Sequence, residues 1–380
     1  EPRDGVCSVA LSSKPGLRQS TAISYLTPDV RARANLDIRS DCFAETLTFD
    51  GAQCTGVHVR TGGATEDLKA KEVVVSAGSL QSPALLMRSG VGPAAQLGTY
   101  GIDVVADRAG VGQNLHEHPT CILAAHLRYN GMQDAGLRAA GNAALRHSSK
   151  LDGCPPHDFY MAIANKVSWH PLGTRVGGAV VAVVKPYSRG AVTLKSADPA
   201  VNPRVAFHVL EDERDMARMK MGLRLFYEIF RSPAVRDVTT EVFPAAFSAR
   251  VRRLNMETRA NWWKSFAGSL LMDLPGPFRR AALRTLIAPG PTLDDIFATD
   301  ATLEAWIREN CRGFFHPVGT CRFGTAADPM AVVDPAGRVH GVNGLRVVDA
   351  SVMPAIVRAN TNLTVIMIAE KIADMMKDDR

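Results

Sequence analysis

The chain has 380 residues, of which 46% are hydrophobic and 22% charged, and its formal net charge is +6. This length exceeds the size at which one hydrophobic core usually stops growing, so we expect two domains with sizeable cores. The composition excludes a largely disordered chain. The charge is modest and the basic residues are mostly scattered, so nucleic-acid binding is not indicated.

Targeting and redox signals are weak. The seven cysteines include no C-x-x-C pair, and their spacing suggests neither a zinc site nor a disulfide framework. Residues 1–25 lack the pattern of a signal peptide, and no run approaches the roughly 20 apolar residues of a membrane span. We therefore expect a cytoplasmic location, with peripheral attachment to the inner membrane as a second option.

The first part of the chain carries short β-rich runs separated by turn residues. Asp50-Gly51 and Thr61-Gly62-Gly63 are typical turns and predict a small antiparallel sheet. The expected strands are Asn35–Arg39, Thr46–Phe49, Gly56–Arg60 and Lys71–Ala77. The last run is apolar without alternation, which is typical of a strand buried on both faces. A helix is expected to begin near Ser82-Pro83, because serine caps helices and proline is tolerated in the first turn.

The middle of the chain, from about Thr120 to Asn310, has a different character. Val176–Lys185 and Gly190–Leu194 are predicted strands, and Asp212–Phe230 is a predicted amphipathic helix. Its apolar stripe comprises Met216, Met219, Leu223, Phe226 and Phe230. The basic stretch 250–291 is interpreted as a helical cover of this domain, with a helix on a membrane surface as the alternative.

The last seventy residues are again rich in motifs. Leu345–Ala350 is predicted to be a buried strand that ends near the acidic Asp349, and Asn362–Met376 to be the final helix. His316 is followed by proline, which disfavours helical dihedrals, and Gly319 allows a sharp turn. An imidazole presented from a turn suits a general base, although a structural histidine fits the same pattern.

Two long segments resemble the signature motifs of the glucose-methanol-choline (GMC) oxidoreductases. His316 to Arg322 reads His-Pro-Val-Gly-Thr-Cys-Arg, which is similar to the active-site motif of that family, and Gly78 to Pro93 is similar to its second signature. Further similar segments are Val111 to Pro119, Pro186 to Gly190, Ser196 to Pro199 and Gly344 to Asp374. The resemblance is patchy over 120–310, which we interpret as the variable substrate domain.

The resemblance implies an FAD-dependent enzyme that oxidises a primary alcohol to the aldehyde by hydride transfer to flavin N5. His316 is then the catalytic base that removes the hydroxyl proton, and Asn360 binds the alcohol oxygen. Some relatives carry histidine at the second position and choline-type members carry asparagine. The asparagine at position 360 therefore favours choline or a simple aliphatic or aromatic alcohol as the substrate.

The same resemblance implies the cofactor-binding residues. The first turn of the final helix, at Asn362 and Thr364, offers unpaired N–H groups and a partial positive charge to the flavin. The other family positions that line FAD correspond to Ala44, Ser76, Ala77, Gly78, Asp349 and Ala350.

Some residues depart from the family pattern. His116 and Glu117 stand where glutamine and aspartate are usual, and Phe323 replaces a methionine of similar size. His116 and His118 could suggest a metal pair, but two alternate residues on an extended segment need at least one more ligand, so no metal is predicted.

A Gly-x-Gly-x-x-Gly turn for the pyrophosphate is missing from the sequence. The most similar stretch is Gly110-Val111-Gly112, but Leu115 stands in place of the third glycine. The resemblance places residue 1 inside the usual family chain, so we expect the N-terminal dinucleotide-binding segment to be absent here. The alternative function is a truncated, non-catalytic remnant that binds FAD poorly. A third possibility is a hydrolase that uses Ser76 or Ser79 with His316, but the sequence lacks the Gly-x-Ser-x-Gly elbow that such enzymes need.

The expected fold is α/β, an α+β flavoprotein with a discontinuous FAD-binding domain and an inserted sheet-and-helix substrate domain. Residues 1–119 and 311–380 form the first and residues 120–310 the second. The expected partners are a small alcohol and an electron acceptor, which is a quinone, an electron-transfer protein or oxygen, with a dehydrogenase favoured. The oligomeric state is not predicted. Trp169, Trp262 and Trp263 are candidates for an aromatic cage around a quaternary ammonium.

Overall fold

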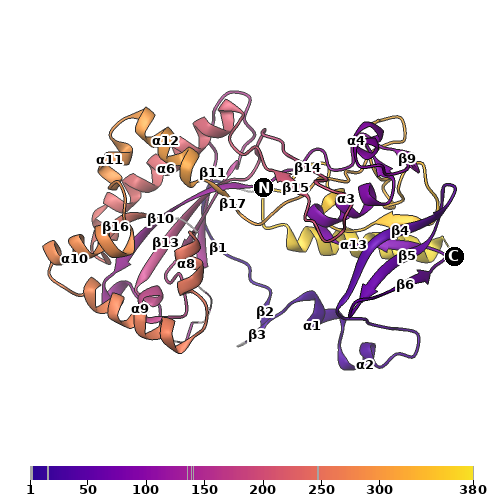
Figure 1. Cartoon of the computed structure of the whole chain (residues 1–380). Helices are drawn as coiled ribbons and strands as arrows, with labels where there is room; N and C mark the ends of the chain where they lie inside the picture. The colour runs from indigo at the N-terminus through magenta and orange to yellow at the C-terminus, as the bar shows by residue number, and fades with distance from the viewer. Residues whose placement is uncertain are drawn as a thin grey trace. The chain divides into compact units, whose positions relative to one another are not determined.

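The computed structural model describes residues 3–14, 17–134, 136, 137, 139, 141–245 and 248–379. The chain divides into two compact units, whose elements are labelled in Figure 1. Unit 1 comprises Glu1–Gln19, Pro119–Tyr187 and Leu210–Phe314, and unit 2 comprises Ser20–His118, Ser188–Val209 and Phe315–Arg380.

These boundaries differ from the predicted ones at two places. The first residues of the chain belong to unit 1, because strand β1 (Gly5–Ser8) pairs with β11 (Gly141–His147). Ser188–Val209 belongs to unit 2, where Leu115 and Gly190 form a β-bridge. The predicted roles of the units in binding FAD and substrate stay predictions.

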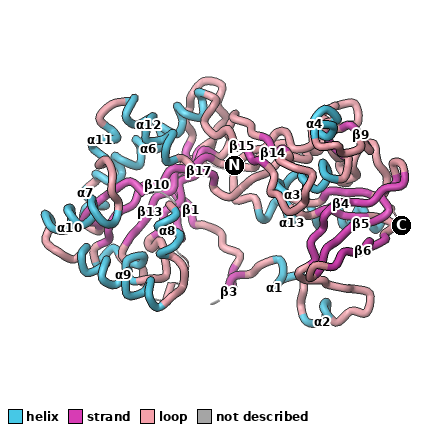
Figure 2. Tube along the Cα trace, viewed as in Figure 1, coloured by secondary structure: helices cyan, strands magenta, loops and turns pink. Residues whose placement is uncertain are grey.

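Unit 1 is built on an antiparallel sheet of seven strands in the order β1-β11-β12-β13-β10-β16, with β17 paired to β10. In Figure 2 its strands gather in the interior with helices around them. The remaining strands are β10 (Pro119–Leu127), β12 (Phe159–Ala164), β13 (Val176–Val183), β16 (Thr239–Ala245) and β17 (Arg312–Gly313), with a separate hairpin of β2 (Ser13–Lys14) and β3 (Leu17–Arg18). The predicted strand at Val176–Lys185 is thereby confirmed.

Helix α6 (Glu213–Arg231) packs on β13 and β10. Its predicted stripe is buried at Met216, Met219, Leu223 and Phe226 but only partly at Phe230. The Asp212 side chain caps the N-terminus by accepting from Arg214 N–H. The other helical elements of unit 1 are η1 (Tyr129–Gly131), α5 (Pro171–Thr174), α7 (Pro233–Arg236), α8 (Ala249–Leu254), α9 (Arg259–Met272), α10 (Gly276–Ala282), the π-helical turn η2 (Leu283–Ile287), α11 (Leu293–Phe297) and α12 (Asp300–Asn310). The stretch 250–291 is therefore helical, as expected. None of the helices in the described part of the chain combines the length and the apolar character that a membrane crossing requires.

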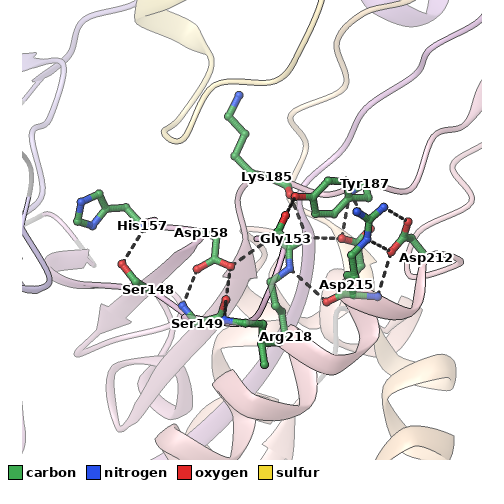
Figure 3. A network of polar contacts seen from close by, with 12 residues as sticks. Ser148, Ser149, Gly153, His157, Asp158, Lys185, Tyr187, Asp212, Asp215 and Arg218 are labelled. Atoms are coloured by element: carbon green, nitrogen blue, oxygen red, sulfur yellow. Dashed lines mark hydrogen bonds and ion pairs between the residues drawn. The ribbon is translucent and has the colours of Figure 1, made fainter. Parts of the chain in front are cut away.

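A buried ionic network fastens α6 to the loops beside it (Figure 3). The Arg218 guanidinium is fully buried, and it binds the buried carboxylates of Asp158, at 3.4 Å, and of Asp215. Asp215 also accepts the backbone N–H of Tyr187 at 2.9 Å, and Asp158 accepts the hydroxyl of Ser149 at 2.7 Å. Each buried charge is thus paired and hydrogen-bonded, as burial of a charge requires.

Unit 2 contains two sheets in or beside which most of the predicted cofactor residues lie. The antiparallel sheet β4-β5-β6 comprises β4 (Cys42–Asp50), β5 (Gln53–Thr61) and β6 (Ala64–Lys69), and β7 (Val73–Val75) pairs in parallel with β18 (Leu345–Val347). The other elements are α1 (Thr21–Tyr25), α2 (Pro28–Arg31), α3 (Gly78–Arg88), β8 (Val91–Gly92), α4 (Ala94–Thr99), β9 (Ala106–Asp107), β14 (Ala191–Thr193), β15 (Arg204–Ala206), η3 (Ala350–Val352) and α13 (Asn362–Asp378). The core of unit 2 gathers around α3, with Leu85, Leu86 and Met87 buried.

Three predictions for unit 2 are wrong in detail. Asn35–Arg39 forms no strand, whereas β6 follows the Gly62-Gly63 turn where none was expected. Strand β7 is not buried on both faces, because Val74 is 41% exposed. Helix α3 begins at Gly78, so Pro83 lies inside it rather than at its start.

Pro83 has no N–H to donate to the Ser79 carbonyl, four residues earlier in α3. The Thr320 hydroxyl takes that place and donates to the Ser79 oxygen at 2.7 Å. Pro83 is therefore accommodated because another segment of the chain satisfies the carbonyl that it leaves unpaired.

Replacement of Arg218 by Met is expected to destabilise unit 1 by roughly 3–5 kcal/mol, because it leaves two buried carboxylates without their cation. The matched control is Arg224→Met, which removes an exposed ion pair with Asp300 and should therefore change the stability of unit 1 little. All four tryptophans lie in unit 1, so urea unfolding followed by tryptophan fluorescence measures this unit. Equal midpoints of urea unfolding for the two variants would contradict the stabilising role assigned to Arg218.

Candidate active site

The segment that carries His316 lies between two other segments of unit 2. Val318 and His116 exchange backbone hydrogen bonds of 2.9 and 3.1 Å on one side, and Cys321 N–H donates to the Ser351 carbonyl at 2.8 Å on the other. Gly319 has φ +98°, and a Cβ atom there would lie 2.5 Å from the Asn114 carbonyl oxygen. Only glycine allows this approach, so the predicted sharp turn at Gly319 is present.

His316 is held at its backbone and at both ring nitrogens. Its backbone N–H donates to the two carboxylate oxygens of Glu117 at 2.9 and 3.0 Å. Its Nδ1 lies 3.0 Å from Nδ1 of His118, and its Nε2 lies 3.4 Å from the amide nitrogen of Asn360. The structure therefore brings together the two residues that the sequence predicts as catalytic.

The His118 imidazole is buried, and its Nε2 lies 3.0 Å from the Val357 carbonyl oxygen. The rings of His118 and His316 meet edge to face, with centroids 5.1 Å apart. The Glu117 carboxylate also accepts the backbone N–H of His118 at 2.9 Å. One dipeptide thus contacts both the backbone and the ring of His316.

The environment of His316 favours the neutral imidazole. The ring is half-buried, and this burial lowers the pKa of His316 below its ordinary value of about 6.5, because the charged imidazolium loses hydration. A neutral imidazole at pH 7 can accept a proton, which is the requirement for a general base.

The predicted cofactor positions gather at the ends of β7 and β18. The Asp349 carboxylate accepts hydrogen bonds from Gly78 N–H at 2.8 Å and from the Ser82 hydroxyl at 2.5 Å. The Ser76 hydroxyl donates to the Val348 carbonyl at 2.9 Å. Asp349 therefore ties the two strand ends together, and Ala350 begins η3 directly after it.

The remaining cofactor positions lie on other elements. Asn362 and Thr364 occupy the first turn of α13, whose N-cap residue Thr361 makes no side-chain capping bond. Ala44 lies in β4 opposite Val59. Its neighbour Glu45 accepts a bond from Arg88 at the C-terminal end of α3, whereas Gly78 begins that helix. Ala44 therefore lies beside a residue that contacts the opposite end of α3 from Gly78, and its role in binding FAD stays a prediction.

Two further expectations concern metals and aromatic residues. No group of three His, Cys, Asp or Glu that could hold a metal occurs in the described part of the chain. The rings of Trp262 and Trp263 lie 4.8 Å apart, whereas Trp169 contacts His170 at 5.7 Å. The three tryptophans are therefore not assembled as one cage.

Comparison with known proteins identifies the family. Models of the GMC oxidoreductase family match residues 1–120 and 186–369. The chain is 40% identical over 98% of its length to 5-(hydroxymethyl)furfural oxidase of Methylovorus sp. (strain MP688) and 33% identical over 96% to oxygen-dependent choline dehydrogenase of Pseudomonas putida (strain GB-1). It covers 63% and 60% of these two proteins.

The chain belongs to the GMC oxidoreductase family. The solved structure of pyridoxine 4-oxidase from Mesorbium loti is similar with a TM-score of 0.76 and 23% identity, over 98% of this chain and 64% of that one. The predicted α/β fold with two domains is thereby confirmed.

GMC oxidoreductases are FAD flavoproteins, and the site geometry suits this cofactor. Ser76 and Ala77 are exposed, and apart from Gly78's chain neighbours and its own helix backbone, nothing lies within 4 Å of the position that a Gly78 side chain would occupy. The first turn of α13 is exposed at Asn362, and its uncapped N–H groups can donate to a bound anion. The end of β7 with Ser76–Gly78, the Asp349-Ala350 backbone and the start of α13 are therefore the parts of this GMC chain that would hold FAD.

The sequence analysis missed three residues that shape the site. In the sequence, Glu117 stands out only as a departure from the family pattern, His118 only within a motif and as a rejected metal ligand, and Thr320 only as one residue of the His316 motif. Their roles depend on contacts between distant segments: His118 and His316 are 198 residues apart, and Thr320 and Ser79 are 241 residues apart. The one signal in the sequence that could have indicated a contact between His118 and His316 is that both lie inside GMC motifs.

The lowered pKa of His316 gives a prediction that is independent of catalysis. In a ¹⁵N-histidine NMR titration, the His316 signals should change with a midpoint below the ordinary value of about 6.5. The unfolded chain takes up this proton near pH 6.5, so His316 should stabilise unit 2 fully above that pH and progressively less as the pH falls through the lower folded pKa. A His316→Ala spectrum assigns the signals. A midpoint above 6.5 would contradict the role of burial.

Proposed function

We propose that the chain forms the catalytic part of an FAD-dependent oxidoreductase that converts a primary alcohol to the aldehyde. The observation that carries the proposal is the distance of 3.4 Å between His316 Nε2 and the Asn360 amide nitrogen. A base and a donor this close can share one oxygen atom, because the amide donates to the alcohol oxygen while the imidazole accepts its proton. FAD, when bound, supplies the acceptor for the hydride that leaves the alcohol carbon.

The residues of this chain have separate tasks in that reaction. His316 Nε2 removes the hydroxyl proton of the alcohol. This raises the electron density on the oxygen and favours loss of hydride from the carbon that bears it. Asn360 orients the oxygen toward the base. The first-turn N–H groups of α13 favour negative charge beside them. We assign FAD binding to unit 2, which holds every predicted cofactor residue, and substrate recognition to the inserted unit 1.

The substrate class follows from the named relatives. A 5-(hydroxymethyl)furfural oxidase is 40% identical to the chain and a choline dehydrogenase 33% identical. We therefore favour a primary alcohol carried on a furan or aryl ring over choline. Asn360 is compatible with both classes.

The electron acceptor is proposed on the same basis. The names of both relatives refer to an oxidase or to dependence on oxygen. We therefore favour oxygen over a quinone or an electron-transfer protein, in place of the dehydrogenase expected from the sequence. A cytoplasmic location remains our prediction.

The proposal is tested with protein expressed from its complete reading frame. Its visible absorption spectrum is recorded without oxygen, before and after addition of 5-(hydroxymethyl)furfural, benzyl alcohol or choline. Bleaching of the flavin bands by the ring alcohols and their return on admission of air are expected. A protein that remains colourless with added FAD would refute the proposal and favour the non-catalytic remnant.

His316→Ala is expected to slow flavin reduction by roughly a hundredfold or more, which is the usual effect of losing a general base. Stopped-flow absorbance under anaerobic conditions measures this rate. The matched control is His58→Ala, which removes a half-exposed histidine from β5 in the same unit. Loss of bound FAD from the His316 variant, instead of loss of rate, would assign His316 to cofactor binding.

Asn360→Ala is expected to lower kcat/KM for the alcohol by roughly 10²-fold, since it removes a donor to the reacting oxygen. Asn360→His restores a donor and should recover part of that loss. Because Asn360 is exposed, the midpoint of urea unfolding should change little in either variant. An unchanged kcat/KM in Asn360→Ala would remove this residue from the site.

A further inference from the structure

His118 is a buried histidine whose two ring nitrogens both lie 3.0 Å from a polar partner. Nε2 faces the Val357 carbonyl oxygen and Nδ1 faces Nδ1 of His316. A ring flipped by 180° would place carbon atoms at both positions. The orientation of the His118 ring is therefore fixed by its contacts.

The contact with Val357 decides which nitrogen of His118 carries the proton. A carbonyl oxygen can only accept a hydrogen bond, so Nε2 of His118 must be the donor. His118 is 1% exposed, and its neutral ring carries one proton only. In the neutral ring, Nδ1 of His118 therefore has the lone pair and accepts.

The proton between the two histidines must then belong to His316. Its Nδ1–H donates to Nδ1 of His118, and a neutral His316 consequently has its lone pair on Nε2. The Asn360 contact agrees independently, because an amide nitrogen can only donate and therefore needs an acceptor at His316 Nε2.

We propose that His118 is the positioning residue that keeps the proton of His316 on Nδ1 and so leaves Nε2 as the atom that accepts the proton of the substrate. This inference rests on the proposed function only in its last step, because the tautomer of His316 exists whether or not an alcohol is bound. The Val357 carbonyl determines which nitrogen of His118 has the proton, and His118 in turn determines which nitrogen of His316 has it.

Glu117 holds the backbone of the same turn. Its carboxylate accepts the N–H groups of His118 and His316, which keeps the two imidazoles on adjacent backbone positions. The Glu117-His118 dipeptide therefore fixes where the His316 ring lies and which nitrogen is basic. Loss of an outer partner that orients a metal-bound histidine typically costs about 10- to 100-fold in activity or metal affinity, and we expect a loss of similar size for a histidine that acts as a base.

Three substitutions of His118 separate its two contacts. His118→Asn keeps an acceptor oxygen near the position of Nδ1 and loses the donor to Val357. His118→Gln keeps an amide nitrogen near the position of Nε2 and loses the acceptor for His316. His118→Leu removes both and has a shape similar to that of asparagine.

The direct readout is the ¹⁵N spectrum of histidine-labelled protein from the complete reading frame, at a pH where His316 is neutral and without any alcohol. The His316 signals, identified by their loss in His316→Ala, should be those of the Nδ1–H tautomer in the wild type and in His118→Asn. In His118→Leu and His118→Gln, a mixture of tautomers or the Nε2–H form is expected. The rate of flavin reduction should fall about 10- to 100-fold in these two variants and be largely retained in His118→Asn.

The outcomes are distinct. An Nε2–H tautomer in the wild type, or an unchanged Nδ1–H tautomer in His118→Leu, would overturn the inference, and so would equal rates in His118→Asn and His118→Leu. If no alcohol reduces the wild-type flavin while the tautomer pattern is as described, the proposed function fails and the role of His118 toward His316 stands. Because the tryptophans lie in unit 1, urea unfolding of each variant is followed here by circular dichroism, which includes the signal of unit 2 and checks that this unit is folded.

Discussion

The turn that carries His316 belongs to neither a helix nor a strand, so its backbone polar groups must find partners in other segments, and this requirement determines where the histidine lies. The segment 112–118 supplies partners on one side and the segment 349–352 on the other, and Gly319 N–H donates to the Ala350 carbonyl. The Thr320 hydroxyl satisfies the Ser79 carbonyl that Pro83 leaves without its helical partner. Four segments that are distant in the sequence are thereby fixed against each other, and each of them contains a GMC motif.

The same contacts connect the base to the cofactor positions. Asp349, which ties β18 to the start of α3, lies beside Ala350, whose carbonyl accepts from Gly319. A displacement of the His316 turn would therefore also disturb the strand ends at which FAD is expected. Preorganisation of this kind allows a base and a donor to meet one oxygen atom without further rearrangement.

The sequence predicted much of this arrangement, for identifiable reasons. His316, Gly319 and Asn360 lie in or near long motifs, and the helix at Asp212–Phe230 has a clear apolar stripe. Val74 was misjudged because an apolar run does not reveal which of its faces is covered, and Pro83 because its helical role depends on Thr320. The roles of Glu117 and His118 depend on contacts with His316 across about 200 residues, which neither periodicity nor local propensity can indicate. The burial of Arg218 depends likewise on Asp158, 60 residues away.

The central claim is that His316 and Asn360 hold one oxygen atom of the substrate between them. A crystal structure of the protein from its complete reading frame, with FAD and a primary alcohol bound under anaerobic conditions, tests it most directly. The account predicts the alcohol oxygen within hydrogen-bonding distance of both His316 Nε2 and the Asn360 amide, roughly 2.6–3.2 Å, with His316 Nδ1 still directed at His118. An alcohol oxygen bound by other side chains, with His316 turned away from it, would contradict the account.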